Sequence, residues 1–290
     1  MLDKIRKFLP RKWRSDAPII PVVRLSGTIA AGGSQFRPSL SIASTAEMLE
    51  RAFGIKQAPV VAIIINSPGG SPVQSRLIYK RIRDLAGEKD KKVLVFVEDA
   101  AASGGYMIAC AGDEIIADPC SIIGSIGVVS ANFGFPDAIA KIGVERRVYT
   151  AGTSKFSLDP FQKEKKEDVV KLKETLADMH DVFISLVKTG RGARLKDDPT
   201  IFTGQFWLAE RALGLGLIDS IGDIRSVIKT RYGDKAELKL ISAPRGLLGR
   251  RAGMPAVSSM AEVGAGLADE VLGQIDRQTL WARIGLSVPR

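Results

Sequence analysis

Two short glycine-rich segments are candidates for chemistry, because each follows an apolar run and each contains a serine. The first is Asn66–Gly70 and the second is Ala102–Gly105. Glycine lets a backbone approach a ligand closely, and ligands gather at the carboxyl ends of parallel strands. We therefore expect both segments to face one crevice. There Ser103 at a helix start could act as nucleophile, with the N–H groups of Gly70 and Gly104 forming an oxyanion hole.

A serine hydroxyl is a weak nucleophile and needs a base beside it. The single histidine, His180, lies in a long helical pattern, and we interpret it as a residue on the flank of that helix. A Ser-His-Asp triad is therefore not expected. Lysine is the alternative base, and it reacts near neutral pH only where dry surroundings lower its pKa from about 10.4. Lys155 lies among small and polar residues outside the charged runs and is the candidate, although a solvated loop lysine has the same signature.

The chain has 290 residues, of which 45% are hydrophobic and 26% charged, so it can form one large domain with extensions. Its net charge of +10 is uneven, because basic residues gather at 1–14 and again at 245–251. The first cluster is interleaved with apolar side chains and can lie on an anionic membrane surface. A solvated tail is the open alternative. No basic and aromatic stripe runs through the body, so nucleic-acid binding is not expected.

The longest purely apolar run, Pro59–Ile65, is far shorter than the roughly 20 residues of a membrane-spanning helix. The basic start also lacks the apolar stretch of a secretory signal. We therefore expect a cytoplasmic protein, held peripherally on the inner face of the membrane if its basic ends bind there. Cys110 and Cys120 are interpreted as buried thiols, too few for a disulfide framework or a zinc site.

Apolar runs alternate with helical patterns, which predicts an α/β domain whose strands are mainly parallel. Strands are expected at 19–25, 59–65, 93–97, 114–117, 126–130, 145–150 and 238–241. Helices are expected at 43–53, 137–142, 163–188 and 203–213. Two more are expected after the glycine-rich segments, one following Gly70 and continuing to 86, and one following Gly105 and ending near 112. The predicted division is a basic amphipathic segment at 1–18, a main domain at 19–243, and a C-terminal extension at 244–290 with a helix at 258–284.

Several motifs occur in order along the chain: Asn66–Gly70, Ala101–Tyr106, Gly124–Val128, the segment around Lys155, and Gly214–Asp219. Together they resemble the signal peptide peptidase A family, also called protease IV, with its SohB-like relatives. That family belongs to the Clp protease and crotonase superfamily. The resemblance covers roughly residues 19–242. It implies a Clp protease/crotonase-like fold, with a mainly parallel sheet, flanking helices and an extra C-terminal helical tail.

The resemblance also implies a role for each matched residue. Ser103 corresponds to the nucleophile, Lys155 to the general base, and Ser125 to a serine whose hydroxyl orients the lysine amine. Gly70 corresponds to the loop glycine of the oxyanion hole, with Gly104 as second donor. No metal or organic cofactor is implied. The implied partners are peptide or protein substrates and further copies of the chain, in a ring-like oligomer where the lysine reaches the serine of a neighbouring subunit.

The expected function is therefore a serine endopeptidase that acts on unfolded or hydrophobic peptides, including signal-peptide remnants. Two alternatives from other classes stay open. A crotonase-like acyl-CoA enzyme uses the same oxyanion architecture without a nucleophilic serine. A catalytically silent membrane-surface scaffold would use the basic start and the unassigned residues 244–290. The chain departs from the family in having only a short basic start where members commonly carry an N-terminal membrane segment.

Overall fold

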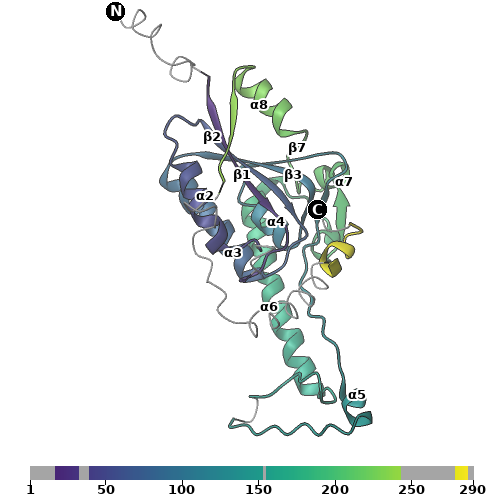
Figure 1. The fold of residues 1–290 in the computed structure, drawn as a ribbon. Helices are drawn as coiled ribbons and strands as arrows, with labels where there is room; N and C mark the ends of the chain where they lie inside the picture. The colour runs from purple at the N-terminus through teal and green to yellow at the C-terminus, as the bar shows by residue number, and fades with distance from the viewer. Residues whose placement is uncertain (1–16, 33–38, 153–154, 243–277, 287–290) are drawn as a thin grey trace, which may run out of the picture.

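One sheet forms the centre of the computed structural model, which describes residues 17–32, 39–152, 155–242 and 278–286. Its main path runs in the order β6-β5-β3-β2-β1-β8, with β4 beside β3 and β7 beside β4 (Figure 1). The strands are β1 (Ile19–Ser26), β2 (Val60–Ser67), β3 (Lys92–Ala102), β4 (Glu114–Ala117), β5 (Ile122–Gly124), β6 (Phe206–Leu208), β7 (Ser220–Ile221) and β8 (Glu237–Leu240). The strand pairs are parallel except for β5 with β6. The predicted α/β class with a mainly parallel sheet and flanking helices is confirmed.

Helices cover both faces of this sheet. The helices are α2 (Ile42–Phe53), α3 (Pro72–Glu88), α4 (Gly104–Ala109), α5 (Pro136–Lys141), α6 (Lys166–Arg191), α7 (Ala209–Gly214) and α8 (Ile224–Tyr232), with a further short helix at 278–282. Of these, α5 lies far from the sheet (Figure 1). Every residue of β2 is buried, as expected for a continuous β-branched run in a parallel sheet. Alternate residues of β2 join a larger core with α2, α3 and α4, and a smaller core with α8 on the opposite face.

Two strands end in short turns that lead directly into helices, and these turns position the candidate residues. β2 ends at Ser67, and α3 begins at Pro72 after the N-cap Ser71, whose side chain accepts a hydrogen bond from the Gln74 N–H. β3 ends at Ala102, and only Ser103 separates it from α4. Because β2 and β3 are neighbouring parallel strands, both turns lie at the same edge of the sheet.

We define the arm as residues 127–152 and 155–179. It includes α5 and the first part of α6, and it extends away from the body (Figure 1). Most of the large exposed hydrophobic side chains lie on the arm: Val129, Phe133, Phe135, Ile142, Val144, Tyr149, Val170 and Met179. The predicted apolar stripe of α6 is accordingly buried only near the body, at Phe183 and Leu186. Leu172 and Leu176, on the arm, are only half-buried.

Three predicted elements are wrong. Residues 126–130 and 145–150 form no strand, and the strand nearest to the first of these is β5. Residues 203–213 are not one helix, because 206–208 form β6 and the helix α7 begins only at Ala209. β6 pairs with β5, about eighty residues earlier in the chain, so local patterns carry no sign of that strand.

The two cysteines differ, which corrects the expectation that both are buried. Cys110, at the C-terminal end of α4, is buried, whereas Cys120 is exposed. The basic segment 1–14 and residues 243–277 lie outside the described residues, so the predicted division into three parts stays a prediction. None of the helices in the described ranges combines the length and the apolar composition that a membrane span requires.

Candidate active site

The two glycine-rich turns touch one another, as their order at the sheet edge predicts. A Cβ built on Gly69 would lie 2.8 Å from both the Gly104 nitrogen and the Ser103 Cβ. A Cβ on Gly70 would lie 2.0 Å from the Ile29 carbonyl oxygen. Gly69 and Gly70 also have φ angles of 103° and 141°, which residues with a side chain rarely adopt. Glycine is therefore required at both positions for the first turn to pack against the turn that carries Ser103.

Ser103 has an unusual backbone conformation and an uncommitted hydroxyl. Its φ of 51° and ψ of −122° lie outside the regions that residues with a Cβ favour. Although it is the N-cap of α4, its side chain makes no capping hydrogen bond. Its backbone is held on both sides, since its N–H donates to the Gly124 carbonyl at 2.8 Å and its carbonyl accepts from the Met107 N–H at 3.0 Å. The fold thus fixes Ser103 and leaves its Oγ available.

Backbone donors beside Ser103 are also uncommitted. Gly104 is the first residue of α4, so its N–H has no intrahelical acceptor. Among the described residues, neither the Gly104 nor the Gly70 N–H donates to a backbone carbonyl outside the regular elements. Both glycines line the same cleft as Ser103. This is the arrangement that an oxyanion hole requires, with N–H groups beside a nucleophile.

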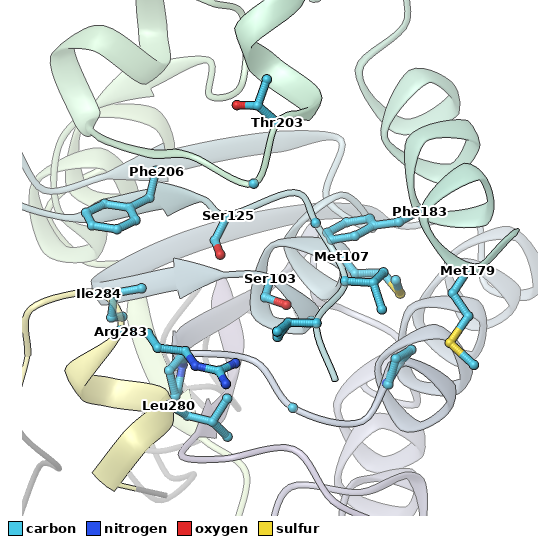
Figure 2. Close-up of a pocket in the computed structure, with 18 residues that line it drawn as sticks. Ser103, Met107, Ser125, Met179, Phe183, Thr203, Phe206, Leu280, Arg283 and Ile284 are labelled. Carbon is cyan, nitrogen blue, oxygen red and sulfur yellow. The ribbon is translucent and has the colours of Figure 1, made fainter. Parts of the chain in front are cut away.

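Ser125 lies next to Ser103. Ala102 and Gly124 are paired residues of β3 and β5, so the two serines follow neighbouring strand ends. Ser125 also has a φ of 51°, and its N–H donates a 2.7 Å hydrogen bond to the Gln205 carbonyl. Both serines line the cleft, where Figure 2 shows them between Phe206 and Met107.

The cleft has a volume of about 530 Å³, and most of the side chains that line it are apolar, while hydroxyl groups and glycine backbone make much of its wall polar. Its apolar side chains come from α4, the start of the arm, α6, β6 and the C-terminal helix: Met107, Val128, Val129, Met179, Phe183, Phe206, Leu280 and Ile284. Sequence reasoning assigned Phe183 and Met179 to a core stripe and did not single out the others as site residues. Phe183 and Met179 belong to the apolar pattern of the long helix, but such a pattern does not distinguish residues of a core from residues that line a cleft.

Lys155 is not brought to Ser103 within one chain. It lies on the arm, its side chain is exposed, and it is not among the residues that line the cleft. Its backbone N–H donates to the Gly152 carbonyl at 3.3 Å. The dry surroundings expected for this amine are therefore not provided by the single chain.

His180 occupies the place that the sequence predicts. It is half-buried on the flank of α6, and its Nε2 lies 3.0 Å from the Ile126 carbonyl oxygen. It does not line the cleft, although its neighbour Met179 does. This ring is engaged away from Ser103 and does not form a triad with it.

Comparison with known proteins places the chain in a family. Residues 86–239 match the model of peptidase family S49, a range that contains Ser103, Ser125 and Lys155 and begins after Gly70. The chain belongs to peptidase family S49. The predicted family resemblance is thereby confirmed. A putative protease of Synechocystis sp., 33% identical over 204 residues, matches 68% of this chain and 73% of its own length.

The S49 chain is also 58% identical over 286 residues to a Brucella abortus protein named Na(+)/H(+) antiporter NhaA. The match covers 97% of this chain and 39% of that relative, so the chain spans about two fifths of the relative's length. Among solved structures, a membrane-bound stomatin-specific protease has a TM-score of 0.47 and 18% identity, over 79% of this chain and 100% of that one.

Proposed function

We propose that this chain is a serine endopeptidase that cleaves peptide bonds through an acyl-enzyme on Ser103. The observation that carries the proposal is the free Ser103 hydroxyl, fixed at a positive φ in a cleft beside the unused N–H groups of Gly70 and Gly104. Membership in peptidase family S49 supports the same chemistry. A hydroxyl held in this way can attack a carbonyl while the two N–H groups stabilise the negative charge on its oxygen.

The proposed reaction needs one base that also serves as acid. Neutral Lys155 accepts the Ser103 proton as Oγ attacks the carbonyl carbon, and Ser125 orients the amine. The protonated Lys155 then gives its proton to the leaving amine, so the peptide bond breaks and a serine ester forms. Water hydrolyses that ester with Lys155 again as base, which frees the second product and restores the hydroxyl.

We propose further that Lys155 acts on Ser103 of a neighbouring subunit. Two observations support this arrangement. Lys155 lies on the arm and outside the cleft of its own chain. The arm also exposes more large apolar side chains than the body does, and exposed apolar surface of this kind marks interaction sites. In an assembly where the arm of one copy packs over the cleft of the next, these side chains would be buried and water would be excluded from the Lys155 amine.

The proposed substrates are extended segments of unfolded or hydrophobic peptides. The walls of the cleft support this choice, since Met107, Phe183 and Phe206 offer apolar surface on both sides of Ser103 (Figure 2). Apolar side chains in the wall of a cleft favour apolar side chains of a ligand. Signal-peptide remnants belong to this class of peptide.

A fluorophosphonate probe tests the nucleophile. We expect wild-type protein to be labelled on Ser103, as located by mass spectrometry, and Ser103→Ala to remain unlabelled. The matched control is Ser130→Ala, an exposed serine outside the cleft, which should label like wild type. Acyl-CoA turnover that survives Ser103→Ala would instead favour the crotonase-like alternative, and labelling of the Ser103→Ala protein would refute the proposed nucleophile.

Mixing subunits tests where the lysine comes from. Ser103→Ala and Lys155→Ala are each expected to be inactive alone. If the dyad forms between subunits, oligomers co-assembled at random from both variants regain activity at about a quarter of their sites. If the dyad forms within one chain, no subunit holds both residues and the mixture stays inactive. That second result would contradict the intersubunit arrangement while leaving the probe test of Ser103 intact.

Peripheral attachment to the inner face of a membrane remains part of the proposal. Its support is the basic, amphipathic composition of residues 1–14, which lie outside the described residues. Deleting residues 1–14 should weaken co-sedimentation with anionic liposomes and leave peptide hydrolysis near normal. Unchanged co-sedimentation would favour a solvated tail.

A further inference from the structure

The described C-terminal segment, residues 278–286, packs against the strand that leads to Ser103. Trp281 and Ile284 are 1% and 4% exposed, and they form a small separate core with Ala100, Ala102 and Ile122. Small alanines on β3 leave room for the indole ring. The segment is thus fixed to the sheet directly beside the candidate nucleophile.

Anchoring by Trp281 determines which side chains of this segment reach the cleft. Leu280 and Arg283 are three residues apart and lie on one side of the segment, where both line the cleft with Ser103. Figure 2 shows Arg283 extending from the C-terminal helix into the space below Ser103, with Leu280 next to it. The contact between Trp281 and the sheet therefore holds a guanidinium at the site.

Arg283 is the charged residue of this cleft. Among the described residues, the others that line the cleft are glycines or have apolar or hydroxyl-bearing side chains. Arg283 is exposed to the cleft, and it forms no ion pair with the acidic residues of the described ranges. A guanidinium binds carboxylates through two parallel hydrogen bonds, and apolar surroundings strengthen that attraction.

We propose that Arg283 is a specificity-determining residue that binds a carboxylate of the substrate peptide near the cleaved bond. This rests on the proposed peptidase function. The carboxylate comes from an Asp or Glu side chain or from the free C-terminus of the peptide. The apolar walls hold the flanking side chains, while Arg283 selects the peptides that place an acid at its position.

Matched fluorogenic peptides test the proposal and distinguish the two sources. One series replaces Glu by Gln at each position around the cleaved bond, and the other replaces a free C-terminus by its amide. We expect kcat/KM to favour the acid member of one series by about 10-fold, the range of a charge-assisted hydrogen bond. Arg283→Gln should abolish this preference, Arg283→Lys should retain part of it, and Arg283→Glu should shift it toward peptides with Lys at that position.

The control is Arg225→Gln, which removes an exposed arginine of α8 that does not line the cleft. It should leave the acid preference unchanged. Wild-type protein that cleaves the acid and neutral members of both series with equal kcat/KM would overturn the proposal. An equal loss of kcat/KM for acid and neutral peptides in Arg283→Gln would also overturn it, because Arg283 would then affect the reaction and not the choice of peptide.

Binding separates this proposal from the proposed function. Fluorescence anisotropy measures the Kd of the same labelled peptides for the Ser103→Ala protein, which needs no catalysis. We expect acid peptides to bind about 10-fold more tightly than their neutral partners, and we expect the Arg283→Gln change in this background to remove the difference. If the wild type cleaves nothing but this difference is present, the peptidase proposal fails and the role of Arg283 stands. Equal Kd values would refute the role of Arg283.

Discussion

The N–H of Ser103 donates a 2.8 Å hydrogen bond to the carbonyl of Gly124, the residue before Ser125. This bond joins two chain segments that each place a serine at a φ of 51° on the same cleft. Such a backbone conformation costs a residue with a Cβ about 1–3 kcal/mol and persists where the surrounding structure enforces it. Strain of this kind is concentrated at functional sites, which agrees with the roles proposed for both serines.

The strain at Ser103 predicts opposite effects of one substitution on stability and on activity. We expect Ser103→Gly to have a free energy of unfolding about 1 kcal/mol higher than Ser103→Ala, because glycine adopts the positive φ without a clash. Both variants lack the hydroxyl and should lose peptide hydrolysis by on the order of 10³-fold or more. Urea unfolding followed by circular dichroism gives the first quantity. An alanine variant as stable as the glycine variant would contradict the strain.

The contact between the two turns predicts that Gly69→Ala disturbs the site. Its Cβ would press on Ser103 and Gly104 at 2.8 Å, so we expect kcat/KM to fall by about 100-fold, as for a misplaced catalytic group. The control is Gly87→Ala in α3, where a Cβ meets no atom within 4 Å. That variant should keep its activity and unfold at a slightly higher urea concentration. Equal activity of both variants would show that the turns need not touch.

The candidate nucleophile and its donors were predictable because their signals are local. Apolar β-branched runs that end in Asn66–Gly70 and Ala102–Gly105 predict buried parallel strands with glycine turns, and parallel neighbours bring such turns to one edge. The structure places Ser103, Gly70 and Gly104 in one cleft accordingly. The role of Ser125 came only from the family resemblance, since a serine after a short strand has no distinctive pattern.

The parts that escaped prediction depend on contacts between distant segments. Val128 and Val129 belong to the segment 126–130, which was predicted to be a strand, but they line the cleft instead. Phe206 forms part of a strand because β5 lies beside it, a pairing that no local pattern reveals. Arg283 reaches the cleft because Trp281 packs on β3, and neither residue lies near a recognisable motif. In the proposed assembly the surroundings of Lys155 would come from a neighbouring copy of the chain, and the pattern of one sequence carries no sign of such a contact.

The two thiols are expected to react differently. Burial raises the pKa of the Cys110 thiol to about 12, so it carries almost no thiolate at pH 8, and its side chain is also inaccessible. Cys120 is exposed. We expect iodoacetamide to alkylate Cys120 in the folded protein and Cys110 only after unfolding, as measured by peptide mass spectrometry. Cys120→Ser should remove labelling of the folded protein, and rapid alkylation of Cys110 in that variant would contradict the buried site.

A buried ion pair joins the end of α6 to the segment before β7. Arg191, whose side chain is fully buried, contacts the two carboxylate oxygens of Asp219 at 2.8 and 2.9 Å. The same carboxylate accepts the Ile115 N–H of β4 at 2.7 Å, and the Arg191 Nε donates to the Gly216 carbonyl at 2.8 Å. One pair thus holds a helix, a strand and the Gly214–Asp219 motif together. The carboxylate also pairs with Arg194 at 3.1 Å, so Asp219 would keep one partner if Arg191 were lost. Removing Asp219, in contrast, would leave the buried Arg191 charge without a carboxylate partner.

Asp219→Asn is therefore expected to lower the free energy of unfolding by about 3–5 kcal/mol at pH 7. Burial alone would raise the pKa of Asp219, but hydrogen bonds from Arg191 and Ile115 outweigh it and hold the pKa below its ordinary value. The stabilisation is therefore complete above the unfolded pKa of about 3.9, and it is lost as the pH falls through the lower folded value. Urea unfolding at several pH values should show the gap between wild type and variant narrowing in acid. Asp197→Asn, at an exposed carboxylate, should change little, and a gap that stays constant down to the lowest pH would refute the role of Asp219 ionisation.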